Sequence, residues 1–367
     1  MKCGFWQPTA HAGWTALALA LLGAAAAQAQ SRLQARPQYH IAHEVNLPGD
    51  EGWDYLTYEQ GGHRLFIAHG TQVQVLDTQK LALAGTIPDT PGVHGVALAP
   101  DLGRGYVSAG RTSVIVVFDL KTLARLKEIK STGENPDAII YDEPTHRVFA
   151  FNGRGRSVTA IDAKSDTVAG TIPLDAKPEF AVSDGQGHVY VNLEDKNSIA
   201  VIDPQTLVVS TVWPIGGCEE PSALAMDRTG KRLFTGCGNK LMAVVDATSG
   251  KVLGTAPIGE GVDAAAYDPG ARLAFASCGE GVVTAIAVTP SGAPEVAQTI
   301  PTQRGARTMA LDEHSHRIFT VTADFGTPPA ATPEHPHPRP PILPGTFRVL
   351  VLEKTGMAVR PVHSGRS

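Results

Sequence analysis

Seven polar side chains stand at one repeated position along the chain, each directly before a short apolar segment typical of a β-strand. Carboxylates, an imidazole, a hydroxyl and a guanidinium commonly bind ligands when several of them converge on a concave surface. We therefore expect a small molecule or a protein partner to bind where these side chains meet. The seven residues are Asp54, His94, Asp137, Glu179, Ser222, Asp263 and Arg307.

Three of these side chains, in consecutive copies of the repeat, could hold a divalent metal ion: His94, Asp137 and Glu179. No positively charged residue occupies the repeated position in those copies. Carboxylate oxygens suit Ca²⁺, Mg²⁺ or Mn²⁺, and an imidazole also admits Zn²⁺ or Fe²⁺. With Asp54 or Asp263 as general base, such a metal could support a lactonase-type hydrolysis. The alternative is a water-filled, hydrogen-bonded polar ring without a metal, since no short motif of fixed spacing is present.

Part of the ring, around Arg307, could have a purely structural role. Around the circle of repeats Arg307 falls between Asp263 and Asp54, so these three side chains could form an ion-pair cluster that seals a channel. Loops of the repeat carry further positive charges, which could steer a carboxylate or phosphate ligand or could simply be solvated. These residues are Arg111, Arg154, Arg156, Lys196 and Lys240.

The ring depends on a repeat of four short strands. Residues 134–173 contain four apolar or alternating segments separated by Gly, Pro, Asn and Asp, the pattern of antiparallel strands joined by tight turns. The third segment ends in an apolar pair and an acid, which we expect to cap a turn. This ending recurs at intervals of about 42 residues, at Asp77, Asp119, Asp162, Asp203 and Asp246. Two further copies complete seven units, which predicts an all-β fold, a seven-bladed β-propeller of four-stranded blades.

The ends of the repeat array indicate how the ring would close. Residues 39–47 have the pattern of a fourth strand placed ahead of the first unit. We expect this N-terminal strand to complete the last blade and remove an open sheet edge, although residues 357–362 compete for that role. The seventh unit carries a proline-rich insertion at 323–346, which should form a stiff, extended loop.

The second-strand motifs resemble the Tyr-Val-Thr-Asn repeats of bacterial YncE-like propellers, and the likeness covers roughly residues 40–353. Proteins similar to these include binding proteins, lactonase-type propellers and a haem d1 biosynthesis dehydrogenase, so the resemblance implies the architecture and leaves the activity open. A redox accessory protein would have to bind haem noncovalently, because no Cys-x-x-Cys-His motif is present. The motifs are Tyr106-Val107-Ser108-Ala109, Phe149-Ala150-Phe151-Asn152 and Tyr190-Val191-Asn192-Leu193.

The first 29 residues have the pattern of a signal peptide. Lys2 precedes an apolar run at 14–27, and Ala27-Gln28-Ala29 fits a cleavage site. We expect residues 30–367 to form a single domain and a monomer. The apolar run is too short for a membrane span, so we expect the mature protein in the periplasm or the medium. The formal net charge of −5 argues against binding to nucleic acid.

Export would make the cysteines candidates for a disulfide. Cys218 lies in the loop that leads into the fifth unit, and Cys237 ends the second strand of that unit, so both should reach the same face. We expect a Cys218–Cys237 disulfide, which would stabilise the fold by about 3 kcal/mol. Cys278 occupies the equivalent position in the sixth unit, where it could be a buried small hydrophobe, an exchange partner or a ligand for a soft metal.

Overall fold

The computed structural model describes residues 38–289, 292–332 and 338–355, together with Met1 and Gly4. Contacts divide the chain into two units, Met1–Gln38 and Tyr39–Ser367, and the second contains all strands of the described residues. The predicted signal peptide and the competing strand at 357–362 lie outside the described residues. No helix within the described ranges is long and apolar enough to cross a membrane.

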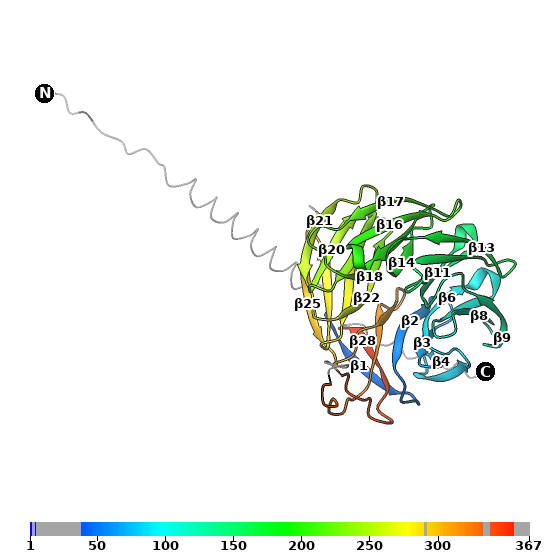
Figure 1. Ribbon diagram of the computed structural model, residues 1–367. Coiled ribbons are helices and arrows are strands. Elements are labelled where there is room, and N and C mark those ends of the chain that lie inside the picture. The colour runs from blue at the N-terminus through cyan, green and yellow to red at the C-terminus, as the bar shows by residue number, and fades with distance from the viewer. Residues whose placement is uncertain (2–3, 5–37, 290–291, 333–337, 356–367) are drawn as a thin grey trace, which may run out of the picture. The chain divides into compact units, whose positions relative to one another are not determined.

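The second unit consists of seven antiparallel sheets, each with four strands (Figure 1). Their innermost strands contact one another in the order β2, β6, β10, β14, β18, β22 and β26, and β26 returns to β2. The sheets therefore follow one another around a closed ring, which confirms the predicted seven-bladed β-propeller. Short 3₁₀ turns lie between the first two strands of blades two and three and between the second and third strands of blade four, at Pro100–Leu102, Glu143–Thr145 and Glu194–Lys196.

The strands of blades one to four are, in chain order, as follows. Blade one contains β2 (Trp53–Glu59), β3 (Arg64–His69), β4 (Gln72–Asp77) and β5 (Ala82–Ile87). Blade two contains β6 (Val93–Ala99), β7 (Arg104–Ala109), β8 (Val114–Asp119) and β9 (Arg125–Lys130). Blade three contains β10 (Pro136–Asp142), β11 (Arg147–Asn152), β12 (Ser157–Asp162) and β13 (Thr167–Pro173). Blade four contains β14 (Pro178–Ser183), β15 (Val189–Leu193), β16 (Ser198–Asp203) and β17 (Val208–Pro214).

The remaining blades continue the same order until the last one, which takes its outer strand from the other end of the chain. Blade five contains β18 (Pro221–Asp227), β19 (Arg232–Cys237), β20 (Leu241–Asp246) and β21 (Val252–Pro257). Blade six contains β22 (Val262–Asp268), β23 (Leu273–Cys278), β24 (Val282–Val288) and β25 (Pro294–Pro301). Blade seven contains β26 (Met309–Asp312), β27 (Arg317–Thr322), β28 (Arg348–Lys354) and β1 (Tyr39–Asn46).

The N-terminal strand closes the ring as predicted. Strand β1 pairs antiparallel with β28, so the blue and red ends of the described chain lie side by side in Figure 1. The side-chain amide of Gln298 in blade six binds the backbone of Tyr39 in both directions, with N···O distances of 2.8 Å. Closure therefore joins blade seven to its neighbour as well as completing its own sheet.

Burial falls from the inner strands of each blade to its outer strand. Every residue of β23 is buried, whereas β5 and β9 are mostly exposed. Apolar side chains of adjacent sheets pack together, as in the stacked rings of Tyr58 and Phe319 from blades one and seven, whose centroids are 5.6 Å apart. A four-stranded sheet cannot bury both faces alone, so this packing between blades supplies the core.

The repeated acids cap turns as predicted. The Oδ1 atom of Asp77 accepts hydrogen bonds from the backbone amides of Gln79 and Lys80, at 3.0 and 2.9 Å. The equivalent atom of Asp162 accepts from the amides of Lys164 and Ser165. These hydrogen bonds favour the charged carboxylate and lower the pKa of both Asp77 and Asp162.

Candidate functional site

A bulge at the start of the innermost strands positions the ring of polar side chains. In blade one, Trp53 pairs with His69, and the pairing is irregular until Leu56 meets Ile67. Asp54 lies inside this irregular stretch, as do its counterparts in the five blades that follow. Six of the seven ring residues are thus the second residue of a strand, not the residue before it as we expected. A bulge frees a residue from regular pairing and re-aims its side chain.

Tyr55, the residue after Asp54, crosses the space between opposite blades. Its ring meets Phe180 of blade four edge to face, with centroids 4.4 Å apart, and its side chain is almost fully buried. Burial raises its pKa, and carboxylates at the ring positions of four blades add to the effect. The phenol therefore lies next to the acidic side chains, and the Tyr55–Phe180 pair bridges the centre of the ring.

His94 lies between two carboxylates. Its Nδ1 atom is 2.7 Å from Asp54 Oδ2 and 3.6 Å from Asp137 Oδ1, while Nε2 is 3.4 Å from Asn135 Oδ1. Burial disfavours the charged imidazolium, but the hydrogen bond to Asp54 and the charges of both aspartates outweigh it and raise the pKa of His94 to about 9. Burial raises the pKa of Asp137 to about 6, against the opposing effect of His94. At neutral pH the imidazole of His94 is therefore protonated.

Glu179 belongs to a different group from the one we expected. Its Oε1 atom is 2.7 Å from Lys177 Nζ, and Tyr55 donates a hydrogen bond of 3.5 Å to its other oxygen. Lys177 also pairs with Glu194. Burial and the charge of Asp137 raise the pKa of Glu179 to about 7, although Lys177 opposes this. Lys177 stands two residues before Glu179 in the chain, so a comparison of the ring positions alone does not reveal this cation.

Arg307 and Asp263 form the third charged group. The guanidinium donates to Asp263 Oδ2 at 2.6 Å and to the Trp53 carbonyl at 3.1 Å. Burial raises the pKa of Asp263 to about 6, against the opposing charge of Arg307. Asp54 pairs with His94 instead of completing the expected three-residue cluster. Ser222, the remaining ring residue, donates to the Val262 carbonyl at 2.9 Å.

The structure therefore brings together part of the predicted metal set. Ligand atoms of Asp54, His94 and Asp137 all lie within 4.8 Å of one another, an arrangement that could hold a divalent ion. Glu179 is engaged with Lys177, and Asp54 takes its place. The side chains of the three clustered residues are each about one-fifth exposed, so solvent and small ions reach them.

A cavity of about 460 Å³ opens beside His94 between blades two and three. Its wall also contains Asn135, Glu134 and two arginines from second-to-third-strand loops, Arg111 and Arg154. A glycine at position 110 provides the space, because a Cβ atom there would lie 2.6 Å from His94 Nε2. The cavity thus joins one member of the ring to part of the predicted basic arc.

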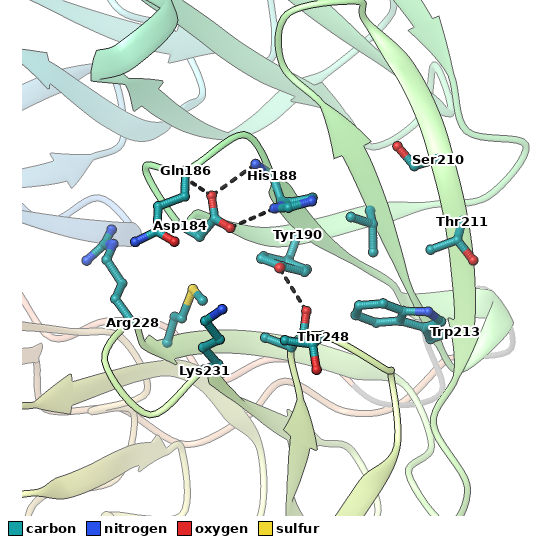
Figure 2. Close-up of a pocket in the computed structure, with 13 residues that line it drawn as sticks. Asp184, Gln186, His188, Tyr190, Ser210, Thr211, Trp213, Arg228, Lys231 and Thr248 are labelled. Atoms are coloured by element: carbon teal, nitrogen blue, oxygen red, sulfur yellow. Dashed lines mark hydrogen bonds and ion pairs between the residues drawn. The ribbon is translucent and has the colours of Figure 1, made fainter.

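Sequence reasoning missed a second cavity, which lies between blades four and five and opens among hairpins on the face opposite the ring. Its volume is about 330 Å³, and Figure 2 shows Tyr190 and Trp213 lining it, with Arg228 and Lys231 on one side. Asp184 accepts a hydrogen bond of 2.8 Å from His188 at its edge. These residues come from two blades at unrelated repeat positions, so no pattern within one repeat could have revealed them.

The predicted disulfide joins the loop before blade five to its second strand. Cys218 and Cys237 have their Cα atoms 5.3 Å apart and form an S–S bond. Cys278 is free and buried, and burial raises the pKa of its thiol to about 12. A thiol that is neutral and enclosed by apolar neighbours behaves as a small hydrophobe.

Comparison with solved structures shows the same architecture. The chain matches the WD40 repeats of RRP9 with a TM-score of 0.71 and 11% identity, covering 87% of this chain and 100% of that chain. A chain of the mitotic checkpoint complex gives a TM-score of 0.70 at 12% identity, with 87% and 93% covered. Hydrazine synthase of Kuenenia stuttgartiensis gives 0.63 at 16% identity, with 75% and 94% covered. At such identities the likeness shows the fold alone.

No protein-family model matches the chain, and no curated protein matches it either. The resemblance to YncE-like propellers therefore stays a prediction from the second-strand motifs. What the geometry adds is a set of three charged groups around one ring, with a cavity beside the His94 group.

Proposed function

We propose that the protein is an exported, YncE-like β-propeller that binds a small anionic ligand at the ring, in the cavity beside His94. The observation that carries the proposal is the wall of this cavity, where His94, Arg111 and Arg154 meet. The apolar run and cleavage-site pattern at the N-terminus support export to the periplasm or the medium.

The two arginines are available to a ligand. Both are exposed on loops, and neither has a hydrogen-bonding or ion-pair partner among the described residues. A guanidinium presents several donors in a planar fork that matches a carboxylate or a phosphate. Glu134 on the same wall would repel an anion at its end of the cavity and thereby orient it.

A thermal-shift screen against inorganic phosphate, citrate and succinate tests this proposal, because a ligand that binds only the folded state raises the Tm. We expect a saturable rise for at least one of these anions, and its loss in the double variant Arg111→Gln/Arg154→Gln. The matched control is Lys196→Gln/Lys240→Gln, which removes the same charge from loops of blades four and five. Equal responses of the two double variants would overturn the proposal.

A metal-dependent hydrolase is the second candidate, and the cluster of Asp54, His94 and Asp137 favours it. A cation there could lower the pKa of a bound water for attack on a lactone or ester. Binding would require His94 to lose its proton, so affinity should rise with pH. Metal analysis of the purified protein, with Tm measured on addition of Ca²⁺, Mn²⁺ and Zn²⁺, tests this candidate. If the purified protein contains no metal and its Tm is unchanged by all three ions, the hydrolase candidate is excluded.

A further inference from the structure

The proline-rich insertion folds back on itself where it leaves blade seven. Phe325 and Ile342 form an antiparallel bridge, flanked by backbone hydrogen bonds of 2.8 Å from Gly326 to Pro341 and from Leu343 to Asp324. The two ends of the predicted loop therefore pair with each other as a short antiparallel ladder. Asp324 fixes its base by accepting a hydrogen bond of 2.7 Å from Gln303 and by pairing with Arg348.

A cavity of about 430 Å³ lies between this ladder and the start of blade one. Its apolar wall is formed by Trp53, Phe325 and Ile342. Gly305 makes the close approach of Phe325 possible, since its φ is +89° and a Cβ there would lie 2.8 Å from the ring. The size is within the range of cavities that enclose small molecules.

Three guanidiniums face the same cavity, from Arg304, Arg307 and Arg339, and no acidic residue among the described ones lines it. Arg307 is already paired with Asp263. Arg304 and Arg339 are exposed, and their guanidiniums have no partner among the described residues. The cavity therefore presents, beside an apolar surface, two positive charges that no described residue neutralises.

Trp53 supplies an aromatic part of this cavity's wall. Its indole packs against Phe325 and Phe347, with centroids 6.1 and 5.4 Å apart, and its exposure is only 9%. The Nε1 atom is buried and has no acceptor among the described groups. Because solvent does not reach this atom, Trp53 offers the cavity its ring surface and not a hydrogen-bond donor.

We propose that this cavity binds an aromatic carboxylate. The aromatic group of the ligand packs against Trp53, Phe325 and Ile342. Its carboxylate pairs with Arg304 and Arg339. This site is separate from the cavity beside His94, so either proposal can fail without the other.

Isothermal titration of the full chain with 2-naphthoate, and with neutral 2-naphthamide as the matched ligand, tests the inference. We expect one saturable site for the carboxylate and affinity at least about tenfold lower for the amide, because a charge-assisted hydrogen bond is lost. The double variant Arg304→Gln/Arg339→Gln should weaken naphthoate by about tenfold or more. Trp53→Phe should weaken it by roughly threefold, because the smaller ring loses part of the aromatic contact.

The control is Arg111→Gln/Arg154→Gln, which should bind naphthoate as the wild type does. Arg304 and Arg339 are exposed, so their replacement leaves the fold intact, and an unchanged Tm confirms this. The inference is overturned if naphthoate fails to saturate, if the amide binds equally well, or if the Arg111/Arg154 variant loses binding while the Arg304/Arg339 variant keeps it.

Discussion

At the scale of single residues, the ring sorts its charges into groups that its repeat position does not specify. His94 pairs with Asp54 across one blade boundary, whereas Glu179 pairs with Lys177 from its own blade. The sequence predicts which residues share the repeated position, since that follows from the period of the strands. Some of their partners lie outside that position: Lys177 and Asn135 each stand two residues before a ring residue. A comparison restricted to the repeated position overlooks that offset.

Replacing Asp54 with Asn should lower the pKa of His94 from about 9 toward its ordinary value of 6.5. The substitution removes a negative charge 2.7 Å from Nδ1 while keeping a side chain of the same size. An NMR titration of the imidazole resonances measures the change. Asp89→Asn, at an exposed carboxylate paired with Arg125, is the control and should leave the titration unchanged. An unaltered pKa in Asp54→Asn would show that this contact does not hold the proton.

The pH dependence of stability should follow the raised pKa values of the ring. Asp137, Glu179, Asp263 and His94 all bind protons more tightly in the folded state, with pKa values of about 6, 7, 6 and 9. Their contribution to stability is present at low pH and is lost as pH rises from about 4 to about 9. Burial lowers the pKa of His69, which acts in the opposite direction near pH 6. We expect Tm to fall between pH 6 and pH 9, and a rise would contradict this.

At the scale of elements, the bulge of the inner strand positions the polar side chains of the ring. The alternation of apolar residues predicts the strands and their order, but it does not predict that Trp53 and Leu56 would flank an irregular pairing with β3. The insertion shows the same limit. Its prolines predict an extended loop. The bridge between Phe325 and Ile342 is accompanied by contacts of the insertion with Trp53 and Gln303, which no local pattern contains.

The disulfide before blade five should contribute measurably to stability. Cys218 and Cys237 are 19 residues apart, and closing a loop of that size stabilises a fold by about 3 kcal/mol. We expect Cys218→Ser/Cys237→Ser to lower the free energy of unfolding by about that amount in urea denaturation. For comparison, dithiothreitol should lower the free energy of unfolding of the wild type by a similar amount. It should leave that of the double variant unchanged. A variant as stable as the oxidised wild type would contradict the role assigned to this bond.

At the scale of the whole molecule, closure depends on segments from both ends of the chain. The pattern of residues 39–47 predicts a strand without a partner, and the count of seven units assigns that strand to the last blade. The contacts across the ring could not be predicted in this way. Tyr55 meets Phe180 from the opposite blade, and Tyr39 meets Gln298 of blade six, because both depend on how the blades are arranged in space.

Removal of β1 should destabilise the entire ring. A chain that begins after Asn46 loses the outer strand of blade seven and the two hydrogen bonds between Tyr39 and Gln298. We expect such a chain to unfold at a Tm lower by ten degrees or more, as an order-of-magnitude figure for losing a strand, and to expose β28 as an edge that favours aggregation. A chain that begins at Tyr39 is the control and should keep the full Tm. Equal Tm values for both truncations would mean that β1 does not close the ring.

The central claim is that the cavity beside His94 binds an anion, and NMR can locate that event directly. The measurement follows the imidazole resonance of His94 at pH 7 during titration with citrate and with phosphate, at constant ionic strength. We predict a saturable shift of this resonance for at least one anion, and its loss in Arg111→Gln/Arg154→Gln. A His94 resonance that does not move, while other histidines respond or none does, would contradict the claim.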